Sequence, residues 1–123
     1  MEGIRTTQQK VIAAYTTLTA LRKKVRGKDA LDLFYLKNAL QTNIDFQAEE
    51  EAKLVADFGG KVTDGGQIII EDPEKRAAFQ KAMAELGAME CEIAADPVKV
   101  SLDRNPDINL GEIEALDGFV TFE

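Results

Sequence analysis

The chain has 123 residues, a formal net charge of -7 and no histidine. Hydrophobic residues make up 45% and charged residues 30%, which predicts one globular domain, residues 1–123, with a single core. The lack of histidine excludes Ser-His, Cys-His and zinc-histidine sites, so catalysis would have to rest on carboxylates, lysines or tyrosines. We therefore expect no enzyme activity and no cofactor.

The sequence gives no sign of a membrane segment or a secretion signal. Every apolar run is far shorter than the roughly 20 residues that cross a bilayer. The start, MEGIRTTQQK, lacks the apolar region of a signal peptide. We expect a cytoplasmic protein without a membrane partner. The single cysteine, Cys91, lies among alternating apolar residues, which predicts a small buried side chain and not a redox centre.

A first helix is predicted from about Thr7 to Arg26, because apolar residues recur at helical spacing from Val11 onward. Near its end lies a basic patch of five residues: Arg22, Lys23, Lys24, Arg26 and Lys28. Such a patch could neutralise phosphates. Cations at the negative end of a helix dipole also explain it, and no aromatic residues interleave to stack bases. We therefore expect no nucleic-acid binding.

A second, longer helix is predicted to begin at Asp29, as its N-cap, and to end before Gly59-Gly60. One side is apolar: Leu33, Leu36, Leu40, Ile44, Ala48, Val55 and Phe58. The short linker between the two apolar stripes predicts an antiparallel helical hairpin over about 7–58. The consecutive acids Glu49, Glu50 and Glu51 cannot all face one partner, which indicates a solvated face over a metal site.

Shorter elements are predicted over about 61–123. Residues 61–63 and 67–71 flank Asp64-Gly65-Gly66, which indicates a β-hairpin. Asp72-Pro73 is typical of a helix start, and this third helix is expected to run to about Leu86 and to be closed by Gly87. Alternation over 89–93 and 98–102 predicts short strands, with a last one in FVTFE. The fold class is therefore α+β: a long antiparallel helical hairpin and a third helix packed with a small, mostly antiparallel sheet.

The segment DRNPDINLGEIE, residues 103–114, resembles the spacing of a calcium-binding EF-hand loop. Its oxygen-bearing side chains stand at positions 1, 3, 5, 7 and 12: Asp103, Asn105, Asp107, Asn109 and Glu114. Position 6 is Ile108, where the loop needs glycine, and position 4 is Pro106. The segment before it also reads as a strand. We therefore favour a turn followed by a short helix, capped by Asn109 and ending near Leu116.

The order of FYLKNALQTNIDFQAEEEAKLVADFGGK, DGGQIIIEDPEKRAAFQKAMAELGAMECEI and LDGFVTFE resembles a family of small uncharacterised proteins encoded by bacteriophages and prophages. The likeness covers residues 30–123 and concerns the layout of the elements. It implies a product of a mobile element, in the host cell's cytoplasm or in the virion, and carries no activity over to any residue.

Two hypotheses for function follow. The leading one is a non-enzymatic interaction or assembly protein of phage type, whose partner is another protein or a second copy of itself. The alternative is an acidic inhibitor of a host defence protein that imitates nucleic-acid phosphates. Residues 1–40 carry eight Lys/Arg and three Asp/Glu, whereas 41–123 carry seven and nineteen. The acids considered for an interaction are Glu49, Glu50, Asp57, Glu71, Asp72 and Glu74.

Overall fold

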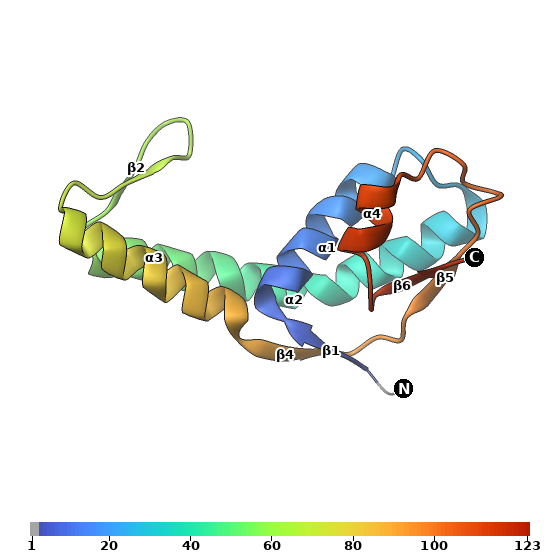
Figure 1. Ribbon diagram of the computed structural model, residues 1–123, viewed down its shortest axis with the longest axis horizontal. Helices are drawn as coiled ribbons and strands as arrows, with labels where there is room; N and C mark the ends of the chain where they lie inside the picture. Colours follow the sequence, from blue (N-terminus) through green and yellow to red (C-terminus); the bar gives the residue numbers. More distant parts are fainter. Residues whose placement is uncertain (1–2) are drawn as a thin grey trace.

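The computed structural model describes residues 3–123 and confirms the α+β class (Figure 1). Helices and short strands follow one another in the order β1 (Ile4–Thr7), α1 (Gln8–Leu21), α2 (Gly27–Asp57), β2 (Lys61–Val62), β3 (Ile68–Ile69), α3 (Pro73–Ala88), β4 (Glu90–Ile93), β5 (Val98–Val100), α4 (Leu110–Ala115) and β6 (Val120–Phe122).

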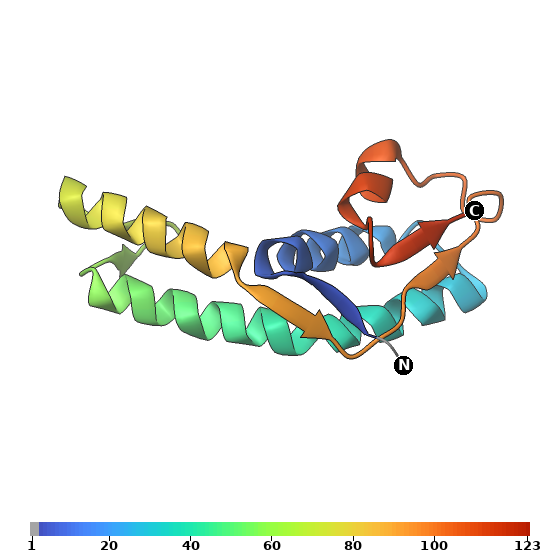
Figure 2. The same ribbon diagram turned by 60° about the horizontal axis from the view of Figure 1, so that its bottom comes forward.

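The long helix α2 organises the whole molecule. Its 31 residues make a rod of about 46 Å at 1.5 Å per residue. Helix α1 runs antiparallel along the first half of α2, as the predicted helical hairpin requires. Helix α3 runs along the second half, so that α1 and α3 lie end to end on α2 (Figure 2). The pairing of α3 with α2 was not predicted.

The turn between α1 and α2 differs from the prediction. Helix α1 ends at Leu21, not at Arg26, because the Lys24 amide donates to the Leu21 carbonyl at 2.8 Å and closes a turn. Helix α2 begins at Gly27, whose φ is 63°, two residues before the predicted cap. The side chain of Asp29 therefore lies inside the first turn and does not cap the helix.

The predicted β-hairpin and the start of α3 are confirmed. Strands β2 and β3 pair antiparallel around the turn at residues 64–66. At the α2–β2 junction an added Cβ on Gly60 would lie 3.1 Å from side-chain carbons of both Val55 and Ile70, so only glycine fits without a shift. Asp72 caps α3 by accepting from the Glu74 amide at 2.9 Å, and Pro73 is the first helical residue.

Helix α3 runs through Gly87 to Ala88 and is not closed at Gly87 as predicted. Gly87 is buried, and a Cβ there would lie 3.3 Å from Cβ of Gln9, so the glycine allows α3 and α1 to approach closely. At the same junction, Nε2 of the buried Gln8 donates to the Asn43 carbonyl at 2.6 Å. These contacts fix the place where α1, α2 and α3 meet.

The strands form three separate two-stranded ladders and not one small sheet. Strand β4 pairs antiparallel with β1, an N-terminal strand that the sequence did not predict. Strand β5 pairs with β6 in parallel, which requires a crossover, and residues 101–119 with α4 supply it. The short strands predicted near 89–93, 98–102 and 119–123 are confirmed.

Most of the buried apolar residues form one cluster. Its fifteen buried members come from β1, α1, the turn between α1 and α2, the first half of α2, β4 and the C-terminal segment. None comes from residues 45–88, where Val55, Ile70 and Leu86 are the buried hydrophobic residues. Ala48, predicted to face the core, is exposed. We call residues 45–88 the arm and the remaining described residues the compact lobe.

Candidate interaction surfaces

Two side chains of the calcium-like segment, residues 103–114, are buried and stabilise the fold. Asn105 is buried, and its Nδ2 donates to the Ser101 carbonyl and to Asp29 Oδ2, both at 2.8 Å. Asp103 and Asp107 are exposed at the surface. The side chain at position 6 of the segment, Ile108, is buried in the core cluster. The candidate oxygens are therefore spread between the interior and the surface.

The predicted capping of α4 is confirmed. Oδ1 of Asn109 accepts from the Glu112 amide, and Oε1 of Glu112 accepts from the Asn109 amide, both at 2.9 Å. Glu114 is exposed. In residues 3–123 no group of three or more His, Cys, Asp or Glu is placed to hold a metal ion.

A buried acidic residue, Asp29, joins α2 to the C-terminal segment. Arg104 donates to it through Nε at 3.3 Å and through Nη2 at 3.1 Å, and Asn105 donates a third bond. These donors, the Arg104 guanidinium first, hold the pKa of Asp29 below its ordinary value, although burial acts in the opposite direction. We call this cluster the Asp29 latch. The sequence reasoning missed it because Asp29 and Arg104 are 75 positions apart.

The predicted basic patch lies at the turn between α1 and α2. Lys24 forms an ion pair within the protein, because its Nζ is 2.8 Å from Glu112 Oε1. Although burial raises the pKa of Glu112, the hydrogen bond from Lys24 and that from the Asn109 amide lower it overall. Lys28 pairs with Asp32 at 3.6 Å. The remaining members of the patch, Arg22, Lys23 and Arg26, are exposed.

A groove of about 360 Å³ runs between α1 and α2 beside this patch. Its floor is largely apolar, and its lining includes Tyr15, Leu18, Leu33 and Phe34 from both helices together with the cations Arg22 and Lys37. No lining residue is acidic, and none belongs to residues 98–123. We call it the interhelical groove.

Three large apolar side chains on α2 are exposed at or next to the groove. The exposed fractions are 49% for Leu31, 54% for Phe34 and 60% for Tyr35, and the two rings are 6.0 Å apart. Their spacing of three and four residues forms a second apolar stripe on α2, beside the stripe that faces the core. The spacing of these three residues is visible in the sequence and could have indicated an exposed apolar surface on α2, which the sequence analysis did not predict.

The arm carries the six predicted acidic interaction residues. Glu49, Asp57, Glu71 and Glu74 are exposed. Glu50 is half-buried and pairs with Lys53 at 3.1 Å, while the exposed Asp72 caps α3. Around them the arm exposes three apolar side chains, with exposed fractions of 38% for Phe46, 62% for Val62 and 47% for Ile69.

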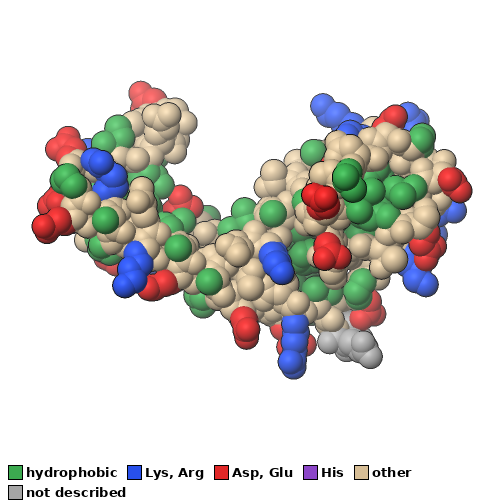
Figure 3. Space-filling view, in the orientation of Figure 1, with side chains coloured by type: hydrophobic (Ala, Val, Ile, Leu, Met, Phe, Trp, Pro, Cys, Tyr) green, Lys and Arg blue, Asp and Glu red, His purple; other side chains and the backbone are tan. Residues whose placement is uncertain are grey.

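The β2–β3 hairpin projects from the end of the arm. In the space-filling view a hollow separates the hairpin from the compact lobe, and acidic side chains are visible at this end of the molecule (Figure 3). Residues of the hairpin line two pockets. Val62 and Ile69 line one of about 460 Å³, and Ile69 also lines one of about 300 Å³. The hairpin is therefore accessible to another macromolecule.

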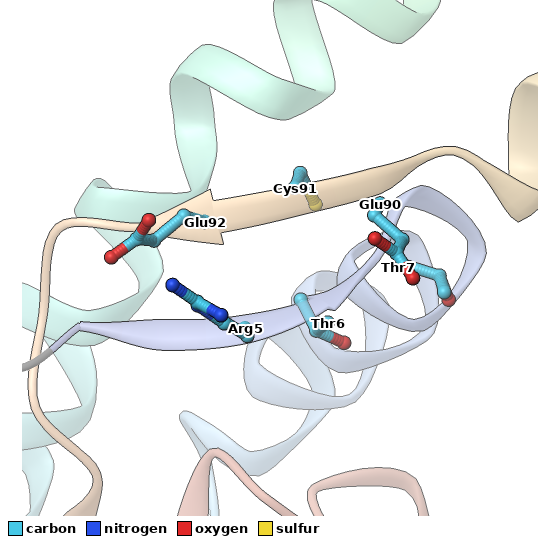
Figure 4. Close-up of a pocket in the computed structure, with 6 residues that line it drawn as sticks. All are labelled: Arg5, Thr6, Thr7, Glu90, Cys91 and Glu92. Atoms are coloured by element: carbon cyan, nitrogen blue, oxygen red, sulfur yellow. The ribbon is translucent and has the colours of Figure 1, made fainter.

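A further pocket of about 500 Å³ lies on the β1–β4 ribbon. Thr6 stands opposite Cys91, and Arg5 opposite Glu92. Glu90 and Glu92, both exposed, lie at opposite ends of the pocket and do not converge on one point (Figure 4). Burial raises the pKa of the Cys91 thiol, which disfavours the reactive thiolate. We assign no reaction to this pocket.

The sequence matches no protein-family model, and no similar protein was found among the curated proteins or the solved structures. No helix within residues 3–123 combines the length and the apolar character needed to span a membrane. The surfaces of the molecule are therefore the basis for a functional proposal.

Proposed function

We propose that the protein is a non-enzymatic interaction or assembly protein that docks through its arm, in the cytoplasm of the cell that makes it. The observation that carries this proposal is the contrast in burial. The arm has three buried hydrophobic residues and exposes Phe46, Val62 and Ile69, whereas the compact lobe holds the whole core cluster. Val62 and Ile69 line one pocket together with Lys61, Glu71 and Asp72, and adjoining exposed apolar side chains rimmed by charge are typical of a docking surface.

The resemblance in layout to phage and prophage proteins supports the assembly role. It gives the context in which a projecting, accessible hairpin would be used, namely the host cell's cytoplasm or the virion. The same resemblance names no partner, so the chemistry of the surfaces has to supply one.

The nucleic-acid mimic is a second candidate that the geometry supports less well. A mimic needs a continuous row of carboxylates, as along a phosphate backbone. In the arm, Glu50 is paired with Lys53, and Asp72 is used as a helix cap. Lys61, Lys75 and Arg76 are also exposed among the acids. The arm is therefore a mixed apolar and charged surface.

A photoreactive amino acid placed at Val62 or at Ile69 tests the proposed function. In cells that express the protein, we expect either position to form covalent adducts with protein. Lys99, exposed on β5 of the compact lobe, is the matched control position. Adducts no more frequent at the arm than at Lys99 would rule out docking through the arm. Adducts confined to one nucleic-acid-binding protein, and absent when a lysate is irradiated at about 0.5 M salt, would favour the mimic.

A further inference from the structure

The interhelical groove has a positive rim that the fold does not neutralise. Among the described residues, Arg22 and Lys37, which line the groove, form no ion pair with a carboxylate. Lys23 and Arg26 of the neighbouring basic patch form none either. Lys37 Nζ instead lies 5.1 Å from the centroid of the Tyr15 ring at the groove. An occupant of the groove should therefore combine apolar side chains for the floor with carboxylates for the rim.

The end of the arm has this combination. We call residues 57–74 the arm end. It exposes Val62 and Ile69 on the hairpin, and the exposed carboxylates of Asp57, Glu71 and Glu74 form no ion pair within the described chain. The hairpin stands clear of the compact lobe of its own molecule (Figures 1 and 3).

We propose that the interhelical groove of one copy of this chain binds the arm end of a second copy. The inference rests on the proposed function and deepens it by naming the partner. Val62 and Ile69 pack on the apolar floor and against Phe34, while the carboxylates of the arm end lie against Arg22 and Lys37. Each copy then offers one groove and one arm end, so the contact joins copies head to tail.

The charges oppose the alternative two-fold contact. A dimer that pairs groove with groove would place Arg22 and Lys37 of one copy against the same cations of the other, and like charges across an interface suppress binding. A head-to-tail contact places opposite charges together instead. Because it uses two different surfaces, it leaves a free groove and a free arm end on every open assembly, and the assembly closes into a ring or grows as a filament.

Sedimentation velocity of the full chain tests the proposal. We expect the wild-type protein to grow beyond a dimer as its concentration rises over a roughly hundredfold range at about 20 mM salt, and to dissociate at about 500 mM salt. A groove variant, Arg22→Glu with Lys37→Glu, and an arm variant, Asp57→Lys with Glu71→Lys, should each need at least about tenfold higher concentration to associate.

Mixing the two variants gives the sharpest result. The groove variant keeps its arm end and the arm variant keeps its groove, and the exchanged groove is also complementary to the exchanged arm end, so the mixture should form a complex in which the two variants alternate. A chain that carries all four substitutions has both charges exchanged and should regain self-association. As a control for net charge, Glu90→Lys with Glu114→Lys, two exposed positions outside both surfaces, should assemble like the wild type.

Three results would overturn the proposal: a wild-type protein that stays monomeric at low salt, a groove variant that assembles as well as the wild type, or mixed variants that do not form the complex. The photo-crosslinking at Val62 separates the two levels of inference. Adducts with other proteins only would overturn self-docking and leave the interaction function standing. A level of adducts equal to the Lys99 control would overturn both.

Discussion

The two halves of α2 belong to one unbroken helix, yet they have different surroundings. In the compact lobe Leu33, Leu36 and Leu40 are buried against α1 and the C-terminal segment. In the arm, the same helix has Val55 as its buried hydrophobic residue and α3 as its neighbouring helix. Helical stability in proteins comes mainly from packing of one face. Stability should therefore vary along α2 although its backbone is continuous.

The side-chain hydrogen bonds show the same difference. Those inside the arm join residues at most six positions apart, such as Arg76 Nε to the Ile70 carbonyl. Those of the compact lobe include links over 35 positions from Gln8 to Asn43 and over 75 positions from Arg104 to Asp29. Local bonds close short loops and can break without disturbing the rest of the fold. The compact lobe is therefore held together as a unit, whereas the arm can open separately.

Two matched truncations on α2 would test this comparison most strongly. Leu36→Ala should lower the free energy of unfolding by about 3–4 kcal/mol, because it leaves a cavity in the core cluster. Leu54→Ala, at a half-buried position in the arm, should cost about 1 kcal/mol. Urea unfolding followed by circular dichroism measures both. Equal losses at the two positions would mean that the arm is packed as tightly as the lobe.

Loss of the Asp29 carboxylate should have the next largest effect. Asp29→Asn leaves Arg104 without its charged acceptor and should lower the free energy of unfolding by about 2 kcal/mol. The control is Asp32→Asn on the same helix, which loses a pair of 3.6 Å with the exposed Lys28 and should change stability by less than about 0.5 kcal/mol. Thermal unfolding at neutral pH compares them. Similar losses of stability in the two variants would show that the Asp29 latch stabilises the protein no more than an exposed ion pair does.

The pH dependence of the Asp29 latch should follow from its pKa. The folded pKa of Asp29 is lower than its ordinary value of 3.8, so its stabilisation is complete above 3.8 and is lost as the pH falls toward the folded value. The stability difference between wild type and Asp29→Asn should therefore shrink below pH 3.8. Urea unfolding of both proteins at stepped pH measures it. A difference that stays constant through this range would contradict the pKa shift.

The smallest effect should be confined to the arm. Asp72→Ala removes the N-cap of α3 and should cost about 1 kcal/mol. Hydrogen exchange followed by mass spectrometry should show faster exchange in α3 and unchanged exchange in α1. Asn109→Ala removes the corresponding cap of α4 in the lobe and serves as the comparison. If Asp72→Ala also accelerates exchange in α1, the arm and the lobe unfold together.

The parts of the fold that could be read from the sequence are those with local causes. The unbroken run before Gly59 predicted α2, Asp72-Pro73 predicted the start of α3, and Asn109 predicted the cap of α4. Each depends on residues within about four positions of one another, which a sequence shows directly.

The parts that could not be read depend on distant partners. Strand β1 has only four residues and exists by pairing with β4, more than 80 positions later. Asp29 has the sequence context of a cap, but its partner Arg104 comes from the far end of the chain. The groove was missed for a related reason: α1 covers the core stripe of α2 and leaves the second stripe at Phe34 and Tyr35 uncovered.

The continuity of α2 also makes it a lever. No glycine or proline interrupts it between residues 28 and 57, so it has no built-in hinge. A tilt of about 5° at its first turn, where the latch grips it, would displace the far tip by about 4 Å over the length of the rod. A force applied at the β2–β3 hairpin would accordingly exert a torque on the first turn of α2. In the other direction, a small rotation of the first turn would produce a large displacement of the hairpin.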